Sequence, residues 1–242
     1  MSEPTLTMGY AEFCSETGYF LGYGRDAISS PVKWTSDQQT AIDNVVQGGV
    51  RRFYNPPAIG KEPPYRWSFM EPVTTLTTVA NTADYALPEA FAGIRGELTF
   101  APADAWWIAV ALVDENQIRA LRQQPTGLTG HPRAAAVQWY STAGSSPQLA
   151  KLLLYPTPNA VYTLSYRYQC KQNALTVAAP YPLGGQPHVE TILASILAVA
   201  EERMNDVRGM RWESFMERLT ASVEFDKARL NPEVYGYCGD PG

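Results

Sequence analysis

The chain has 242 residues, which is enough for one large or two small domains with a sizeable core. Its 45% hydrophobic and 18% charged residues are ordinary for a globular protein, and its formal net charge of -5 argues against a protein that grips nucleic-acid phosphates over its whole surface. The 14 tyrosines and 6 tryptophans exceed the needs of one modest core, and such a surplus is typical of interfaces and of β-rich domains.

The cysteines and the N-terminus indicate the compartment in which the chain folds. Cys14, Cys170 and Cys238 are far apart and form no CxxC pair or Cys/His cluster, which favours reduced thiols. No stretch approaches the roughly 20 apolar residues of a membrane span. The start "MSEPTLTMGY" has neither the basic residues nor the apolar run of a signal peptide. We therefore expect synthesis in a cytosol, no export by the general secretory route and no membrane partner.

Two helices are predicted near the N-terminus. Aromatic and aliphatic residues of segment 7–22 recur on one helical face. A second helix follows Thr35, which has the spacing of a capping box with Gln38. This helix must end at "NPP", residues 55–57, because proline lacks the backbone donor and restricts the residue before it.

Strands are predicted next, because the hydrophobic period changes to two from about Val73. The segments are "VTTLTTVANTADYALP" (a strand, a turn and a short strand), "GIRGELTF", "WWIAVALV", "AAAVQWYS", "QLAKLLLYP" and "VYTLSYRYQC". Asp114 has the position of an N-cap for a short helix that extends to Gln124. Trp67 and Phe69 alternate in "YRWSF" as in a strand with one buried face, so packing is favoured over nucleic-acid binding there.

The helical period returns in two C-terminal segments, 184–207 and 211–230. Two helices at each end and strands between them predict an α+β fold, in which N- and C-terminal helices form a bundle with an inserted antiparallel β domain. The predicted domains are the helical bundle, 1–61 and 180–230; the β domain, 62–179; and an extended C-terminal tail without periodicity, 231–242.

The sequence shows no catalytic or metal-binding set. The two histidines lack further ligands at the spacing of a metal site. We interpret His131 as an exposed loop residue and His188 as a solvent-facing or helix-capping residue. The glycine pairs at 48–49 and 184–185 match neither a phosphate loop nor a dinucleotide fingerprint, and the first pair indicates close helix packing or a local bend. We therefore predict no enzyme activity and no cofactor.

Charged residues mark two further regions. In the C-terminal helices the two signs alternate, which favours a solvated or subunit-facing surface over a catalytic acid pair. The candidate inter-subunit residues are Arg203, Arg211, Glu213, Glu217 and Arg218. At the exit from the second helix, basic residues complement a helix dipole, so a direct grip on DNA is the minor interpretation. The residues of this predicted domain junction, stiffened by proline and packed by aromatic rings, are Arg51, Arg52, Tyr54, Pro56, Pro57 and Trp67.

Several of these patterns occur together in one order. They are "WTSDQQTAIDNVVQGGVRRFYNPP", "YRWSFMEPVTTLTT", "DYALPEAFAGIRGELTF", "LLLYPTPNAVYTLSYRYQC" and "YPLGGQPHVETILASILAVAEERM". In this combination the chain resembles the head-to-tail adaptor, or connector, proteins of tailed double-stranded DNA phages. It is most similar to the adaptor subunits directly beneath the portal, often labelled tail tubular protein A-like. The resemblance covers roughly residues 8–230 and includes no catalytic signature.

The resemblance implies a structural virion protein at the head–tail neck, assembled in the host bacterial cytoplasm. Such subunits form a ring, usually of twelve copies, that binds the portal above and tail, nozzle or head-closure proteins below. Double-stranded DNA passes through the lumen without specific binding. The C-terminal segment of these proteins commonly docks on the portal, which places candidate portal contacts at Pro232, Val234, Tyr235 and Tyr237. The same segment has no core of its own, which fits folding against a partner and also fits a disordered terminus.

Two other functions stay open at this point. A head-closure or tail-terminator ring is one, although such subunits are usually smaller and β-dominated, and the four long helices count against it. A carbohydrate-binding or hydrolytic tail component is the other, and it would need clustered carboxylates or an aromatic platform. Trp106 and Trp107 are the adjacent pair that could form such a platform, and a strand edge explains them equally well.

Overall fold

The structure is a computed structural model, and it describes residues 6–25, 34–104, 109–123, 127–141 and 148–230. It confirms the α+β fold class. The chain forms two compact units. The helical unit comprises Met1–Phe69 and Gln172–Gly242, and the β unit comprises Met70–Lys171.

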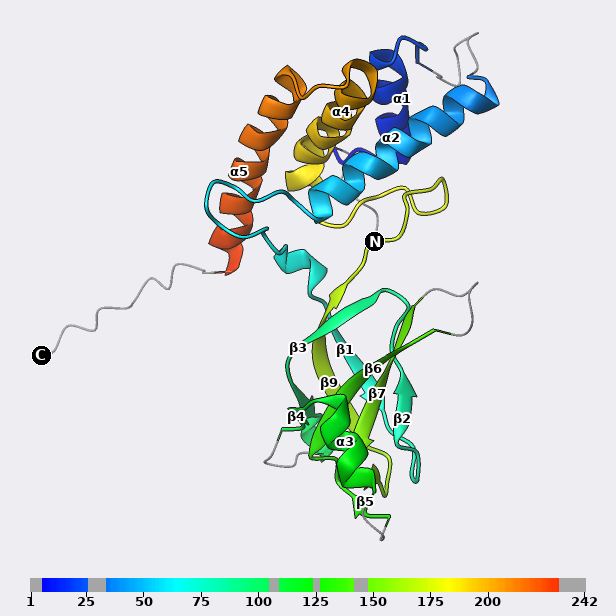
Figure 1. Ribbon diagram of the computed structural model, residues 1–242, viewed down its shortest axis with the longest axis vertical. Helices are drawn as coiled ribbons and strands as arrows, with labels where there is room; N and C mark the ends of the chain where they lie inside the picture. Colours follow the sequence, from blue (N-terminus) through cyan, green and yellow to red (C-terminus); the bar gives the residue numbers. More distant parts are fainter. Residues whose placement is uncertain (1–5, 26–33, 105–108, 124–126, 142–147, 231–242) are drawn as a thin grey trace, which may run out of the picture. The chain divides into compact units, whose positions relative to one another are not determined.

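Four α-helices build the helical unit within its described residues (Figure 1). They are α1 (Tyr10–Phe20), α2 (Ser36–Tyr54), α4 (Val189–Asn205) and α5 (Met210–Leu230), with a short 3-10 turn, η3 (Gln186–His188), before α4. Helix α4 is central, because it packs against α1, α2 and α5. Ile192 and Ile196 of α4 are fully buried, as are Phe215 and Leu219 of the neighbouring helix α5, where Val223 is nearly so.

The ends of α2 form as the sequence predicts. The Thr35 hydroxyl accepts a hydrogen bond from the Gln38 backbone N–H (3.3 Å), and the Gln38 side chain accepts one from the Thr35 N–H (2.9 Å), so the predicted capping box is confirmed. The helix stops at Tyr54, with Asn55 as its C-cap residue before the prolines at 56 and 57.

Gly49 explains how closely α2 and α4 approach each other. A Cβ atom at this position would lie 2.4 Å from the Ile196 Cα and 2.6 Å from its backbone nitrogen, closer than any real contact. The Ser195 hydroxyl donates a hydrogen bond of 2.8 Å to the Gly49 carbonyl across the same contact. Of the two interpretations of the glycine pair, close helix packing is therefore the one that the structure supports.

Two sheets enclose the core of the β unit. The first has the antiparallel order β1-β9-β3, with β1 (Val73–Thr77), β9 (Thr163–Cys170) and β3 (Phe91–Phe100). The second has the order β2-β7-β6-β4, with β2 (Asp84–Ala86), β7 (Leu149–Tyr155), β6 (Ala134–Tyr140) and β4 (Ala111–Leu112). Leu98 and Leu164 from the first sheet and Leu152 and Leu154 from the second belong to one buried cluster.

Smaller elements complete the β unit. Helix α3 (Glu115–Arg122) begins at the predicted N-cap Asp114, and its buried Ile118 packs with Ala136 and Leu153 of the second sheet. The other elements are the 3-10 turns η1 (Ser68–Met70) and η2 (Pro102–Asp104), the first at the boundary between the units, and the short strands β5 (Thr129–Gly130) and β8 (Thr157–Pro158). The pairs β4–β6 and β5–β8 are parallel, whereas the sequence analysis predicts an antiparallel β domain.

Two predicted strands differ from the structure. The segment around Trp67 and Phe69 is not a strand, because residues 68–70 form η1 and the Trp67 indole is buried against α2. The alternation of aromatic residues there reflects packing on a helix, which period alone cannot distinguish from a buried strand face. Of the segment "WWIAVALV" the structure describes residues 109–113, and within these only Ala111–Leu112 is a strand; residues 106–108, with Trp106 and Trp107, lie outside the described residues.

Residues after β9 also pack differently from the sequence prediction. Leu175 exchanges two hydrogen bonds with the Gln47 side chain of α2 (2.7 and 3.1 Å). The Pro180 carbonyl accepts a hydrogen bond of 2.9 Å from the Tyr10 N–H. Segment 172–188 therefore lies in the helical unit, although the sequence places its first eight residues in the β domain. This segment makes these contacts through its backbone groups, so the pattern of its side chains does not indicate them.

We predict that Gly49→Ala destabilises the helical unit. The new methyl group would collide with the Ile196 backbone, so the free energy of unfolding should fall by about 1–3 kcal/mol, more than the gain in helix propensity returns. Gly48→Ala is the matched control, because its methyl group would meet side-chain atoms and no backbone: a Val199 methyl group at 3.2 Å and the Arg203 guanidinium at 3.8 Å. Thermal and urea unfolding of both variants checks this, and equal stability of the two would contradict the close approach.

Candidate subunit interface

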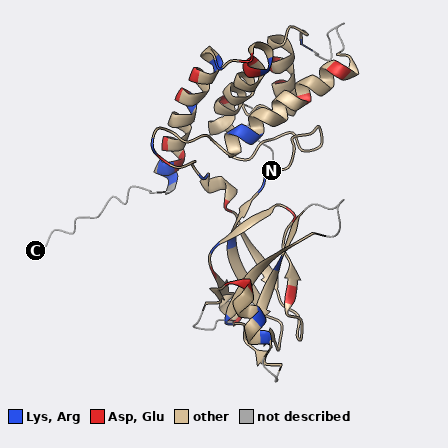
Figure 2. Ribbon diagram, viewed as in Figure 1, with Lys and Arg blue, Asp and Glu red and all other residues tan. Residues whose placement is uncertain are grey.

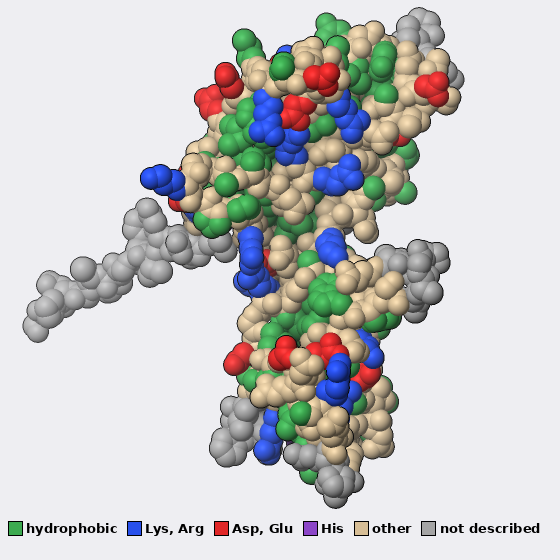
Figure 3. Space-filling model, viewed as in Figure 1, with side chains coloured by type: hydrophobic (Ala, Val, Ile, Leu, Met, Phe, Trp, Pro, Cys, Tyr) green, Lys and Arg blue, Asp and Glu red, His purple; other side chains and the backbone are tan. Residues whose placement is uncertain are grey.

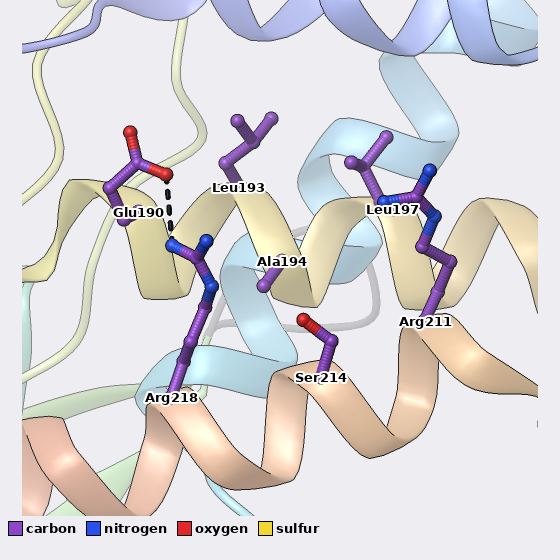
Figure 4. Close-up of a pocket in the computed structure, with 7 residues that line it drawn as sticks. All are labelled: Glu190, Leu193, Ala194, Leu197, Arg211, Ser214 and Arg218. Atoms are coloured by element: carbon purple, nitrogen blue, oxygen red, sulfur yellow. Dashed lines mark hydrogen bonds and ion pairs between the residues drawn. The ribbon is translucent and has the colours of Figure 1, made fainter.

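A shallow groove lies between α4 and α5 and has a volume of about 150 Å³. On the α4 side it is lined by Leu193, Ala194 and Leu197; the two leucines, one helical turn apart, are only partly buried, and Ala194 points toward α5 (Figure 4). Helix α5 supplies its other side with Arg211, Ser214 and Arg218, which recur at helical spacing. The groove therefore combines exposed apolar surface with two guanidinium groups.

The two arginines are held weakly within the chain. Arg218 forms an ion pair of 2.9 Å with Glu190, and both side chains are largely exposed (47% and 66%), so the pair contributes little stability. The Arg211 guanidinium lies 5.4 Å from the centre of the Phe20 ring and has no carboxylate partner among the described side chains. Both groups can therefore bind an external carboxylate at little cost.

The other predicted inter-subunit residues do not line this groove. Glu213 and Glu217 lie one turn apart on an exposed side of α5, and neither forms an ion pair within the described part of the chain. Acidic bands recur along α5 in Figure 2. Arg203 lies near the end of α4, where it donates a hydrogen bond of 3.2 Å to the Asn44 carbonyl of α2. The structure thus brings Arg211 and Arg218 together and separates Arg203 from them.

Arg52 has a role inside the helical unit that the sequence did not reveal. It forms an ion pair with Glu202 of α4, and Arg208 binds the same carboxylate at 2.8 Å. Both guanidinium groups lie over the Trp212 ring, at 5.2 and 4.2 Å from its centre. Burial alone would raise the pKa of Glu202, but the hydrogen bonds from Arg52 and Arg208 outweigh it and hold this pKa below its usual range.

Basic and acidic side chains lie together on the face of the helical unit that Figure 3 shows. Because Glu202 and Trp212 belong to helices far from α2 in the sequence, no local pattern pairs them with Arg52. Arg51, by contrast, is exposed in the last turn of α2, where it complements the helix dipole as expected.

The remaining predicted junction residues pack within the helical unit. The Tyr54 hydroxyl donates a hydrogen bond of 3.1 Å to the Leu183 carbonyl. Pro56 is buried and Pro57 is partly buried. The Trp67 indole N–H donates a hydrogen bond of 2.8 Å to the Phe53 carbonyl, and the two rings stack with centres 4.5 Å apart. Their assignment as a junction between domains stays a prediction.

His188 is buried, so its interpretation as solvent-facing is wrong; it is the N-cap residue of α4, but its side chain makes no capping hydrogen bond. Its ring is 0% exposed and lies 5.2 Å from Trp67, 5.1 Å from Phe69 and 5.9 Å from Phe225, centre to centre. Neither ring nitrogen has a hydrogen-bond partner among the described residues. Burial, with a smaller contribution from Arg229, lowers the pKa of His188, although Asp226 opposes this shift.

Two glycines shortly before His188 are the feature of the sequence that could have indicated its burial. Gly184 and Gly185 have φ angles of +100° and +67°, which glycine adopts readily. A Cβ atom on Gly184 would lie 2.9 Å from the Phe69 ring and 3.1 Å from the imidazole. The glycines thus allow the chain to turn tightly against the aromatic cluster and place His188 inside it. His131, predicted to be an exposed loop residue, lies in a loop but is partly buried beside Tyr162, with ring centres 4.5 Å apart.

Asp226 of α5 is a second buried polar residue that the sequence did not single out. Its carboxylate is 0% exposed and accepts three hydrogen bonds, from the Tyr65 hydroxyl (3.0 Å), the Ser68 N–H (2.8 Å) and the Ser68 hydroxyl (2.5 Å). A buried carboxylate is tolerated when donors replace its lost hydration. These bonds attach the segment around Trp67 to α5.

Other candidate chemistry is limited. Burial raises the pKa of the Cys14 thiol to about 12, which keeps it protonated at neutral pH. Within the described residues, no group of three or more His, Cys, Asp or Glu side chains could hold a metal ion. None of the helices described is both long and apolar enough to span a bilayer. The predicted portal contacts Pro232, Val234, Tyr235 and Tyr237 lie outside the described residues.

We predict that His188 makes stability depend on pH. Because its pKa is lower in the folded than in the unfolded chain, the unfolded state binds more protons below about pH 6.5, and acid should lower the free energy of unfolding. His188→Phe should reduce this loss between pH 7 and pH 5 in urea titrations. Phe69→Leu, which keeps the imidazole, should retain it, and an unchanged slope in His188→Phe would contradict the assignment.

Comparison with known protein families agrees with the geometry. The family model described as SU10 adaptor protein matches residues 8–233, a range that includes all four helices of the helical unit and the whole β unit. A search of curated proteins found no match. Since the family match extends over nearly the entire chain, it accounts for both units together. The chain therefore belongs to the SU10 adaptor protein family, and it is a phage adaptor and a virion component.

Proposed function

We propose that this adaptor forms a ring of twelve copies at the head–tail neck. The ring docks on the portal and connects it to the tail, nozzle or head-closure proteins, and double-stranded DNA passes through its lumen. The observation that carries this proposal is the family match over residues 8–233. The helical unit adds support, because among the described residues its α4–α5 groove has only the exposed Arg218–Glu190 ion pair, and Glu213 and Glu217 of α5 have no ion pair.

The charge of the chain fits a passage for DNA. A net charge of -5 keeps the overall field unfavourable for phosphates, so DNA can slide without the counterion release that accompanies tight binding. Several arginines are occupied inside the helical unit, as Arg52 and Arg208 are by Glu202. The proposed work of the protein is binding to other proteins, without an enzymatic reaction, in a ring assembled in the host cytoplasm.

We predict that the chain forms rings, alone or on isolated portal rings. Mass photometry and electron microscopy should detect a particle of twelve times the 26.7 kDa mass of one chain, seated coaxially on the portal. A chain that stays monomeric at all concentrations and never binds the portal would contradict the proposed function.

Removal of residues 231–242 tests the proposed portal contact. The truncated chain should bind the portal at least about tenfold more weakly while its thermal unfolding is unchanged, because the last described helix ends at Leu230. Tyr235→Ala with Tyr237→Ala should reproduce most of this loss, since aromatic anchors dominate many interfaces. Tyr19→Ala is the matched control, because this exposed tyrosine of α1 has no role in the proposed contact. Equal portal binding by the truncated and full chains would overturn the assignment.

A further inference from the structure

Helix α5 carries opposite charges on two of its sides. Each residue advances about 100° around a helix, so Arg211, Ser214 and Arg218 share one side, and Glu213 and Glu217 share another about 110° away. The first side borders the groove on α4, and the second is exposed. The exposed side is called the acidic edge below.

We propose that the acidic edge of one copy sits in the α4–α5 groove of the next copy. This inference rests on the proposed ring and assigns its subunit contact. Glu213 and Glu217 of one copy would pair with Arg211 and Arg218 of its neighbour, and Arg218 would exchange its exposed pair with Glu190 for the new one. Thr220 and Ala221 complete the acidic edge with small exposed side chains. Helix α5 of one copy can therefore closely approach α4 and α5 of the next copy.

The spacing of the charges differs between the two surfaces by less than the reach of an arginine side chain. At about 1.5 Å per residue, the two glutamates lie about 6 Å apart along α5 and the two arginines about 10.5 Å apart. Arginine side chains are long enough to bridge this difference. Leu193 and Leu197, which line the groove on the α4 side, provide apolar surface beside the charged pairs, and specific interfaces combine apolar and polar surface in this way.

Charge complementarity favours a second copy as the occupant. Within the described residues, the Arg211 guanidinium of the groove has no carboxylate partner, and the Arg218 guanidinium has only the exposed ion pair with Glu190. On the acidic edge, neither described glutamate has a cationic partner. Every copy of the chain provides both surfaces. Because they are different patches, the contact is heterologous, and its repetition produces a ring, as the proposed function requires, when the rotation between copies closes.

Charge reversal tests this contact. In a groove variant, Arg211→Glu and Arg218→Glu, and in an edge variant, Glu213→Lys and Glu217→Lys, like charges would face each other between copies. Each should raise the concentration for half-maximal ring assembly at least about tenfold, equal to about 1.4 kcal/mol per contact. A mixture of the two variants should assemble again, since each surface then meets its complement, in rings with alternating copies and a 1:1 composition by native mass spectrometry.

Matched controls change the same number of charges elsewhere. Lys61→Glu with Arg66→Glu controls for the groove variant, and Glu89→Lys with Glu97→Lys controls for the edge variant, because all four residues are exposed and outside both surfaces. These controls should assemble as the wild type does. Circular dichroism and thermal unfolding establish that each variant is folded.

The outcomes separate this inference from the proposed ring. If the wild type forms no ring, alone or on portal rings, the proposed function fails. If the wild type forms rings and the groove variant or the edge variant does so equally well, only the assigned contact fails. The assigned contact also fails if the mixture of the two variants does not assemble. It fails as well if the groove variant forms rings but no longer binds the portal, because the portal would then be the occupant of the groove.

Discussion

The close approach of α2 to α4 at Gly49 is the contact on which the helical unit depends. A helix pair separated by an ordinary side chain would place α2 farther from Ile196 and would break the hydrogen bond from Ser195 to the Gly49 carbonyl. The short separation brings the last turns of α2 onto α4 and α5, so that Arg52 reaches Glu202 and Phe53 reaches Trp67. With α2 on one side of α4, the residues of α4 at the groove remain available to other partners.

The second constraint is the burial of polar groups at the base of α5. Asp226 is stable there because three donors from Tyr65 and Ser68 replace water. His188 has no such partners among the described residues and stays neutral among aromatic rings. These two side chains connect η1, η3 and α5, three segments far apart in the sequence. Replacing one of them therefore affects contacts made by all three segments.

The surface of the helical unit suits an adaptor. An adaptor works through contacts with other proteins, and the partly buried leucines of α4 and the charged sides of α5 provide apolar surface and charge of both signs for such contacts. The ion pair between Arg52 and Glu202, by contrast, is mostly buried (22% and 23% exposed side chains) and connects α2 to α4. Charges that stabilise the bundle and charges that face outward are thus placed on different parts of the same helices.

The amino-acid sequence by itself determined the helices, most strands, the capping box at Thr35, the end of α2 and the family, because periodicity, prolines and local motifs act within a few residues. Tertiary structure alone decided that Trp67 packs on α2 instead of joining a sheet, that His188 is buried, and that Arg52 pairs with Glu202. It also decided that Arg211 and Arg218 share a groove with Leu193 and Leu197 while Arg203 does not. These contacts join residues distant in the sequence, and the packing of whole helices, which no local pattern encodes, brings them together.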